Sequence, residues 1–207
     1  MQPGEATSPT LLSRVRDGGD AAAWAEFESR YRSLLVRFCQ RQGLQHADAE
    51  DVAQSVLTGL VKSLPRFIYD PHRGRFRDYL YRCARNAISA WRARGSRPFG
   101  RAVALDAGGG GAMDDHAVNP PDTQAEHAWQ EEWVLHHYRL AMRVVRETFE
   151  ARSVEVFNRS LRGEPLASAA AALGISEDAA KKARQRIKAR LQELIRAQIA
   201  EEDQASE

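Results

Sequence analysis

The sequence has little cysteine, no long apolar run and no basic leader. Its two cysteines, Cys39 and Cys83, fall in helix-like stretches without a CxxC or CxxH neighbour, which argues against a disulfide-built or zinc-built fold. No uncharged apolar run approaches the roughly 20 residues that a membrane-spanning helix requires. Residues 1–10 lack the basic start and apolar core of a secretory signal. We therefore expect a protein of the reducing cytoplasm without membrane insertion.

The sequence also lacks the motifs of common catalytic and cofactor sites. The four glycines at 108–111 are not followed by Lys-Ser or Lys-Thr, no HExxH is present, and no nucleophile stands beside a base. His136 and His137 adjoin in a helical stretch, where we interpret them as surface and core residues of the helix rather than a metal pair. An enzyme is therefore disfavoured, and we expect neither a cofactor nor a metal.

Lysine and arginine are segregated from aspartate and glutamate along the chain, although their totals of 30 and 28 nearly cancel. Residues 62–101 contain eleven Lys and Arg against two acids, whereas residues 102–135 contain seven acids and no Lys or Arg. Residues 181–190 then contain six Lys and Arg and no acid. Two cationic blocks on helices with apolar opposite faces, held apart by an acidic spacer, indicate two contacts with a polyanion such as nucleic acid.

Apolar residues recur at helical spacing almost throughout, and no convincing strand-length alternation is present. Ser8-Pro9 is typical of the start of a short helix. Asp20 can cap a long helix that Gly43 ends, and Pro65 ends the next helix. The sequence therefore predicts an all-α protein. We expect its helices at about 9–17, 21–42, 46–64, 75–94, 124–149, 151–162, 166–173 and 177–199.

Residues 96–123 interrupt the helical pattern. They contain Pro98, the four consecutive glycines, the run Asn119-Pro120-Pro121 and almost no large apolar side chain. Such a segment buries too little surface to offset its ordering entropy, so we predict a flexible linker. Two helical domains are expected on either side of it, residues 1–95 and residues 124–207, the second ending in a polar tail.

Residues 166–191 have the form of a helix-turn-helix. The first helix is short and rich in alanine, so a second helix can cross it closely, and Gly174 suits a left-handed position at its end. Ile175 can fill the core between the helices, and Ser176 can cap the second one. At 100° per residue this second helix places apolar side chains on one stripe, namely Ala180, Ala183, Ile187, Leu191 and Leu194.

The opposite side of that second helix is cationic and polar, with Lys181, Lys182, Gln185 and Lys188. A helix anchored through its apolar face can enter a DNA major groove, where Gln pairs with adenine edges and Lys reaches guanine or phosphate. An ordinary helical hairpin with a charged outer face is the alternative interpretation.

The predicted helix at 75–94 carries the other cationic pattern. Its core arc is predicted to comprise Phe76, Leu80, Cys83, Ala84, Ala87 and Trp91. Arginines lie roughly opposite this arc, and the aromatic residues Phe67, Tyr69, Phe76, Tyr79 and Tyr81 are interleaved with them. Exposed rings beside cations suit single-stranded DNA, because the rings stack on bases and the cations hold phosphates. We interpret Phe76 as a core residue and leave Tyr69, in a loop, open.

Three segments occur in a fixed order before the helix-turn-helix: DAEDVAQSVL (48–57), LPRF (64–67) and GRFRDYLYRCARN (74–86). Together they resemble a bacterial RNA polymerase sigma factor of the sigma-70 family, in particular the extracytoplasmic-function (ECF, group IV) type, which keeps only regions 2 and 4. The resemblance covers roughly residues 10–95 and 124–198. It implies a region 2-like helical bundle and a region 4-like helix-turn-helix domain that direct promoter recognition and transcription initiation.

The resemblance also implies protein partners. The helix that begins with DAED would dock on the β′ clamp helices of core RNA polymerase, and the β flap is a second implied contact of the polymerase. An anti-sigma protein is a further candidate partner. The polymerase-binding residues implied by the motif are Asp48, Asp51, Gln54 and Ser55.

Promoter DNA is the implied nucleic acid. The loop at residues 67–75 would capture a base extruded from the −10 element, and the helix after it would contact the adjacent strand or duplex. The −10 residues implied are Tyr69, Arg73, Arg75, Arg82, Arg85, Asn86, Ser89 and Arg92. The −35 residues implied are Lys181, Lys182, Gln185, Arg186 and Lys188.

Two other classes of protein remain open from the residues alone. A stand-alone helix-turn-helix regulator would bind duplex DNA without polymerase, which explains the C-terminal half but not the arginine-rich and acidic-faced helices before it. A protein-interaction adaptor would retain no DNA at all. Binding to core RNA polymerase distinguishes a sigma factor from both.

Overall fold

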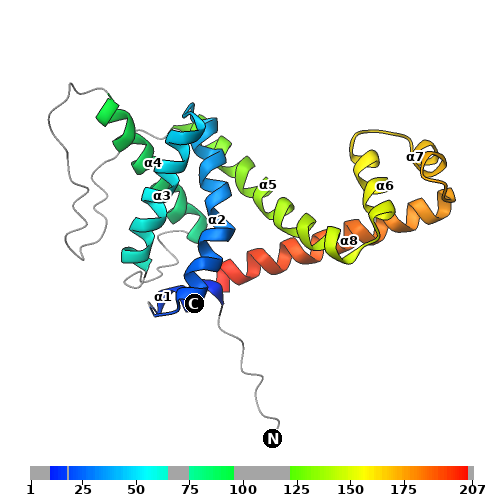
Figure 1. Cartoon of the computed structure of the whole chain (residues 1–207), viewed down its shortest axis with the longest axis horizontal. Helices are drawn as coiled ribbons and strands as arrows, with labels where there is room; N and C mark the ends of the chain where they lie inside the picture. Colours follow the sequence, from blue (N-terminus) through cyan, green and yellow to red (C-terminus); the bar gives the residue numbers. More distant parts are fainter. Residues whose placement is uncertain (1–9, 18, 65–74, 96–121, 205–207) are drawn as a thin grey trace, which may run out of the picture. The chain divides into compact units, whose positions relative to one another are not determined.

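The computed structural model describes residues 10–17, 19–64, 75–95 and 122–204, and within these ranges it consists of eight α-helices without a strand (Figure 1). The all-α fold class is thereby confirmed. No helix in the described ranges is long and apolar enough to cross a membrane. The helices are α1 (Leu11–Arg16), α2 (Ala21–Arg41), α3 (His46–Ser63), α4 (Phe76–Gly95), α5 (Thr123–Thr148), α6 (Ala151–Leu161), α7 (Leu166–Ala172) and α8 (Glu177–Gln204).

The chain divides into two compact units, and the boundary falls inside two helices. The N-terminal unit comprises Met1–Trp133 with Glu201–Glu207, and the C-terminal unit comprises Val134–Ala200. The first part of α5 and the last turn of α8 thus belong to the N-terminal unit. The sequence had instead predicted that a second domain begins at residue 124 and includes all of both helices. The sequence predicts that α5 has an apolar face, but it does not predict the core against which this face packs. The predicted linker, apart from Asp122 and Thr123, lies outside the described residues.

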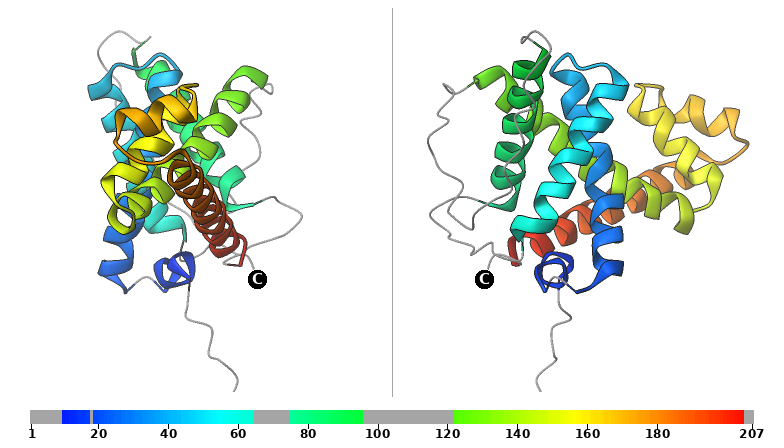
Figure 2. Two further views of the ribbon diagram at one scale, coloured as in Figure 1. Left: turned by 90° about the vertical axis from the view of Figure 1, so that its right-hand side faces the viewer. Right: turned by 60° about the vertical axis from the view of Figure 1, so that its left-hand side comes forward.

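Helices α2, α3 and α4 lie side by side as the body of the N-terminal unit (Figure 2). Asp20 caps α2 as predicted, because its Oδ1 accepts a hydrogen bond from the Ala23 amide at 2.8 Å. Gly43 adopts a left-handed φ of +90° just after α2, as a helix-ending glycine should. Helix α1 is capped by Thr10, whose Oγ1 accepts from the Ser13 amide at 3.3 Å; Ser8 and Pro65 lie outside the described residues.

The core of the N-terminal unit is rich in aromatic rings. Phe27, Tyr31 and Phe38 of α2 are fully buried, and Phe76 of α4 meets the ring of Tyr31 edge-on with centroids 5.4 Å apart. The predicted core arc of α4 is confirmed in part. Phe76, Leu80 and Ala84 are buried, Cys83, Ala87 and Trp91 are half-buried against the same core, and Ile88 is buried in addition.

Tyr79 corrects the interpretation of the aromatic residues around α4. Its ring is buried and its hydroxyl lies 2.8 Å from the hydroxyl of Ser63 on α3. Burial raises the pKa of Tyr79 to about 12. Tyr79 therefore joins α3 to α4 and is not an exposed ring between arginines, because it projects from the side of α4 that faces α3.

The first part of α5 completes this core. Trp129 packs edge-on against Phe38 with centroids 5.0 Å apart, and Trp133 stacks on Tyr31 at 6.3 Å. Burying a tryptophan removes some 150–250 Å² from water, which stabilises the fold by about 4–6 kcal/mol at most. Arg41 at the end of α2 adds ion pairs with Glu131 and with the buried Glu132.

The last turn of α8 also contacts the N-terminal unit. Glu201 accepts hydrogen bonds from the Leu11 amide at 3.2 Å and from the Arg30 guanidinium at 2.9 Å. The carboxylate of Glu202 is buried and accepts from the Tyr31 hydroxyl at 2.5 Å. Burial and this neighbouring carboxylate raise the pKa of Tyr31 well above its usual value. The predicted polar tail thus begins with helical residues that belong to a core.

The C-terminal unit is built from the rest of α5, helices α6 and α7, and most of α8. One buried cluster joins Met142 and Val145 of α5 to Phe157 of α6 and to Ile187 and Leu191 of α8. A second cluster joins Val156 of α6, Ala170 of α7 and Ala180 of α8. The alanines let the three helices approach closely, as the sequence predicts for α7 and α8.

Candidate nucleic-acid interface

The turn between α7 and α8 has the local geometry expected of the helix-turn-helix. Gly174 adopts a left-handed φ of +64°, which a glycine takes without steric cost. Ile175 is half-buried against the cluster of Val156, Ala170 and Ala180. The Ser176 Oγ accepts a hydrogen bond from the Ala179 amide at 3.2 Å and so caps α8. Local sequence therefore fixes where α8 begins.

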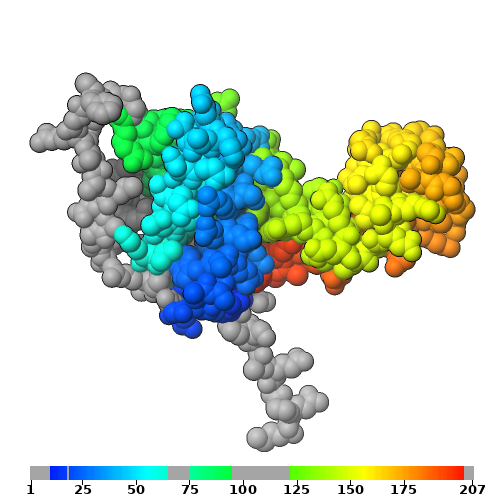
Figure 3. Space-filling model, viewed as in Figure 1, coloured from blue at the N-terminus to red at the C-terminus, as the bar shows by residue number. Residues whose placement is uncertain are grey.

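Helix α8 presents a polar, cationic surface opposite its buried stripe. The buried stripe comprises Ala180, Ile187 and Leu191, with Ala183 and Leu194 half-buried beside them. The surface of this part of α8 is coloured orange in Figure 3. All five predicted −35 residues on the other faces are exposed: Lys181, Lys182, Gln185, Arg186 and Lys188. A helix with this arrangement suits a major groove, because its anchoring does not use the side chains that read bases.

Two of these cations have neighbours within the C-terminal unit. The Lys182 ammonium lies 2.8 Å from the Asp178 carboxylate, both largely exposed, so the pair holds Lys182 only weakly. The Arg186 guanidinium lies 5.7 Å from the ring centre of Phe149, a cation–π contact that orients it. Sequence reasoning missed the Phe149 contact, because the two residues are 37 positions apart.

The predicted polymerase-binding residues lie along α3. Asp51 and Gln54 are exposed, whereas Asp48 and Ser55 are half-buried. The Ser55 hydroxyl donates to the Asp51 carbonyl at 2.9 Å, as a helical serine commonly does. The Gln54 Oε1 accepts from Arg32 of α2 at 2.7 Å. The acids therefore reach the surface, and Gln54 is held in place by α2.

Arg32 organises the surface between α2 and α3, and the motif alone gave no sign of this. Its guanidinium pairs with Glu28 at 2.8 Å and with Glu50 at 2.9 Å, in addition to Gln54. These partners raise the pKa of Arg32, chiefly through the hydrogen bond to Glu50. The Arg32 guanidinium binds side chains of both α2 and α3, and it thereby fixes the position of α3 and of its exposed carboxylates.

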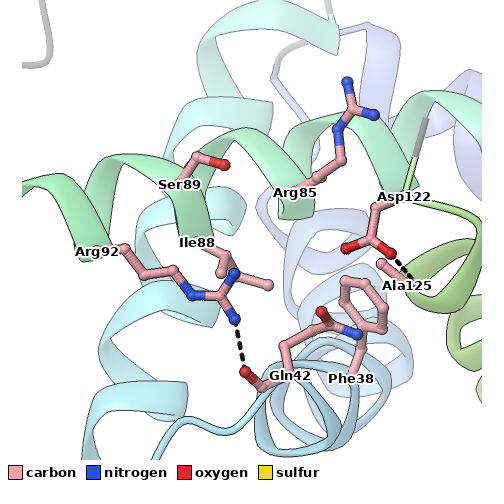
Figure 4. Close-up of a pocket in the computed structure, with 8 residues that line it drawn as sticks. All are labelled: Phe38, Gln42, Arg85, Ile88, Ser89, Arg92, Asp122 and Ala125. Atoms are coloured by element: carbon pink, nitrogen blue, oxygen red, sulfur yellow. Dashed lines mark hydrogen bonds between the residues drawn. The ribbon is translucent and has the colours of Figure 1, made fainter. Parts of the chain in front are cut away.

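The predicted −10 residues on α4 fall on two faces. Arg82 and Asn86 are exposed, and Arg75 is exposed just before the helix. The half-buried Arg85 and Ser89 and the exposed Arg92 line a cavity beside α2 and the start of α5 (Figure 4). Tyr69 and Arg73 lie outside the described residues, so their contribution remains a prediction.

The cavity has a volume of about 270 Å³. Arg92 of α4 donates a hydrogen bond to the Gln42 carbonyl at the end of α2, at 2.6 Å. Asp122 stands at the start of α5, where its Oδ1 accepts from the amides of Gln124 at 3.1 Å and Ala125 at 3.0 Å. The cavity thus brings together cations, a hydroxyl and a carboxylate from three elements of the N-terminal unit.

The cysteines and the histidine pair lie in partly or fully buried positions. Burial raises the pKa of Cys39 to about 12 and that of Cys83 to about 11, so both thiols stay protonated at neutral pH. His136 and His137 are both buried, which corrects the interpretation of one of them as a surface residue, and His137 Nδ1 lies 3.0 Å from Gln198 Oε1. The described residues contain no group of three or more metal-ligating side chains.

The exposed cationic side chains of α8 and the arginines of α4 are of the kind that nucleic-acid-binding proteins present to phosphates and bases. Residues 29–97, about a third of the chain, match the family model described as Sigma-70 region 2. The match spans most of α2 together with α3 and α4, and it supports a sigma-70 family sigma factor that takes part in RNA polymerase binding and promoter melting. No curated protein matches the chain.

Proposed function

We propose that the chain is a sigma factor of the ECF (group IV) type, which binds core RNA polymerase and directs it to promoters. The observation that carries this proposal is the match of residues 29–97 to Sigma-70 region 2. The cationic α8 of a helix-turn-helix, which follows in the chain order expected of region 4, supports it. The protein would act in the cytoplasm and would have no catalytic activity of its own.

The proposed contacts with the polymerase divide between the two units. The side of α3 that carries Asp48, Asp51, Gln54 and Ser55 would dock on the β′ clamp helices, because it offers two carboxylates beside Gln54, whose amide oxygen is held by Arg32. The C-terminal unit would bind the β flap. An anti-sigma protein that covers either surface would compete with the polymerase for it.

The proposed DNA contacts also divide between the units. In the N-terminal unit, Arg75, Arg82 and Asn86 would hold the −10 element together with Tyr69 and Arg73. In the C-terminal unit, α8 would enter the major groove of the −35 element through Lys181, Lys182, Gln185, Arg186 and Lys188. Each contact alone is small, so tight binding would require both units on one polymerase, where effective concentration replaces a second free encounter. Phosphate contacts would make this binding steeply dependent on salt.

Run-off transcription with purified core RNA polymerase on a library of promoter fragments tests the proposal. We expect specific transcripts only when the chain is added. Lys181→Ala with Gln185→Ala should reduce transcription from −35-dependent fragments about tenfold or more, because two base-reading side chains are lost, while binding to core polymerase is retained. Gln192→Ala with Arg196→Ala, two exposed residues further along α8, is the matched control. Equal loss of core binding in the first variant would contradict the division of contacts.

A stand-alone regulator is the second candidate function, because the helix-turn-helix lies complete within the C-terminal unit. Such a protein would bind a specific duplex without polymerase at moderate salt. A sigma factor should show specific duplex binding only in the presence of core enzyme, and it should co-purify with that enzyme. Measuring duplex affinity with and without core polymerase separates the two.

A further inference from the structure

Three hydrogen-bond donors of the N-terminal unit converge at the corner between α1 and α2. They are the Leu11 amide at the start of α1, and the Arg30 guanidinium and the Tyr31 hydroxyl of α2. Leu11 and Tyr31 are buried, and the Arg30 side chain is only 20% exposed. In the described part of the chain, Arg30 makes no ion pair with an acid of α1 to α4. We call these three donors the carboxylate corner.

Two consecutive glutamates in the last turn of α8 occupy the carboxylate corner (Figure 1). Glu201 accepts from the Leu11 amide at 3.2 Å and from Arg30 at 2.9 Å, and the buried Glu202 accepts from the Tyr31 hydroxyl at 2.5 Å. Adjacent residues of a helix project about 100° apart, so a corner between two helices can contact both. Hydrogen bonds to a carboxylate are about twice as strong as neutral ones. The corner therefore recognises paired carboxylates on one helical turn.

The turn that occupies the carboxylate corner is weakly supported. Residues 134–200 belong to the C-terminal unit, so only the end of α8 belongs to the unit that contains the corner. None of its residues from Glu201 to Gln204 is apolar, and helix ends with few buried apolar contacts open most easily. Burying the Glu202 carboxylate also costs desolvation, which offsets part of what its hydrogen bonds contribute. The two glutamates are therefore an occupant that can leave while the unit stays folded.

The chemistry of the carboxylate corner defines what can replace these glutamates. Its donors are divided between two carboxylates, since Leu11 and Arg30 bind one and Tyr31 binds the other. A single small anion replaces only one of the two. A helix with two consecutive acidic residues replaces both, because it reproduces their spacing and direction.

We propose that the carboxylate corner is a docking site for an acidic helix of a partner protein, and that Glu201 and Glu202 compete with that helix for it. The bundle survives the exchange, because its core is the large aromatic and aliphatic cluster of α2, α3, α4 and α5. The inference goes beyond promoter recognition. The corner uses none of the predicted DNA-binding or polymerase-binding residues, so it stands or falls independently of the proposed function.

The test uses the full chain with Glu201→Gln and Glu202→Gln, which weakens the internal competitor. The probe is a fluorescein-labelled alanine-based helical peptide that ends in two consecutive glutamates, and fluorescence anisotropy measures its affinity. We expect this variant to bind the peptide about tenfold more tightly than the wild type does, because the site has lost two charged acceptors. The same peptide ending in two glutamines should bind about tenfold less tightly. Equal binding of both peptides, or of either protein, overturns the proposal.

Matched variants assign the binding to the corner. The control for the first variant is Glu177→Gln with Glu193→Gln, which removes two exposed acids of the same helix and should bind the peptide like the wild type. Added to the first variant, Arg30→Gln should weaken peptide binding about tenfold, whereas Arg37→Gln, at an exposed position of α2, should not. Tyr31→Phe keeps the buried ring and removes only the hydroxyl donor, so it decides the question if Arg30→Gln fails to fold. Peptide binding that none of these donors affects overturns the assignment.

Two further measurements identify the occupant. Light scattering of the wild type from micromolar to millimolar concentration detects association between copies. A dimer that the two glutamine substitutions abolish would make a second copy the occupant and overturn a partner protein. Inorganic phosphate that displaces the peptide as well as unlabelled peptide does would make the corner a general anion site and overturn the paired carboxylates. Run-off transcription without peptide binding rejects only the docking site, and peptide binding without transcription rejects only the proposed function.

Discussion

The two units of the chain build their cores from different residues. The N-terminal unit buries Phe27, Tyr31, Phe38 and two tryptophans of α5 in one continuous cluster. The C-terminal unit divides its buried residues between two smaller clusters, of which one consists of Val156 and two alanines. Because buried apolar area sets most of the stabilisation, we infer that the N-terminal unit is the more stable scaffold and the C-terminal unit the more easily opened.

All four tryptophans, Trp24, Trp91, Trp129 and Trp133, belong to the N-terminal unit. Tryptophan fluorescence therefore follows the unfolding of that unit, and hydrogen exchange of backbone amides follows both. The comparison of the two units can be tested by perturbing one core at a time.

Trp129→Ala should have the largest effect. The ring is almost fully buried between Phe38 and Tyr81, so its removal should lower the unfolding free energy of the N-terminal unit by about 3–5 kcal/mol. Urea unfolding monitored by fluorescence of the remaining tryptophans measures it. Trp24→Ala, at a half-buried position, is the control and should cost clearly less. Equal losses would mean that α5 is only loosely held.

Alkaline pH should have the second-largest effect, because it should lower the stability of the N-terminal unit. Tyrosine in an unfolded chain has a pKa near 10, whereas the pKa of Tyr79 is about 12. Folding keeps the phenol protonated, so stability is complete below pH 10 and falls by as much as about 2–3 kcal/mol as pH approaches 12. Tyr79→Phe should flatten this part of the pH dependence of urea unfolding. Burial also raises the pKa of Tyr138, but this residue lies in the C-terminal unit, so Tyr138→Phe should leave the fluorescence-monitored unfolding of the N-terminal unit unchanged.

Overfilling the alanine cluster should have a somewhat smaller effect, confined to the C-terminal unit. Ala180→Leu adds three carbons where no side-chain surface is exposed, which should cost about 1–3 kcal/mol. Hydrogen exchange should rise in α6, α7 and α8 while tryptophan fluorescence is unaltered. The neighbouring Ala179→Leu, whose side chain is exposed, is the control. A fall in N-terminal stability of the same size would contradict the comparison.

Removing the cap of α8 should have the smallest effect. Ser176→Ala loses the hydrogen bond to the Ala179 amide and should cost about 0.5–1 kcal/mol. Exchange of the first amides of α8 is the measurement, and Ser168→Ala at an exposed position of α7 is the control. Asp20→Ala in the N-terminal unit should cost more, because Asp20 also pairs with Arg14 at 3.0 Å.

The sequence allowed prediction of those features that depend on residues close together in the chain. Gly174, Ile175 and Ser176 act within one turn, so the start of α8 and its cationic face followed from local rules. The buried arc of α4 followed from helical periodicity, with Ile88 as an omission. Local patterns do not say which partner a face meets. The packing of Trp129 and the side of α4 that holds Tyr79 were therefore missed.

The candidate site shows the same limit. The predicted cations in the described part of α4 and α8 were found exposed, except for the half-buried Arg85, because charged side chains avoid burial. The sequence did not predict that Arg85 and Arg92 line a cavity while Arg82 and Asn86 lie outside it. It depends on Asp122, just before α5, and Ala125 of α5 lying beside α4, a contact between segments some 30 residues apart in the chain.

The contacts of Glu201 and Glu202 bear on how the protein is made. Synthesis proceeds from the N-terminus, so Arg30 and Tyr31 leave the ribosome 171 residues before the carboxylates that they bind. The first-emerging bundle therefore acquires its last hydrogen-bond partners only after the helix-turn-helix has been translated. Contacts of such large sequence separation form late in folding, and a nascent chain halted before α8 is finished would leave the Tyr31 hydroxyl without its carboxylate.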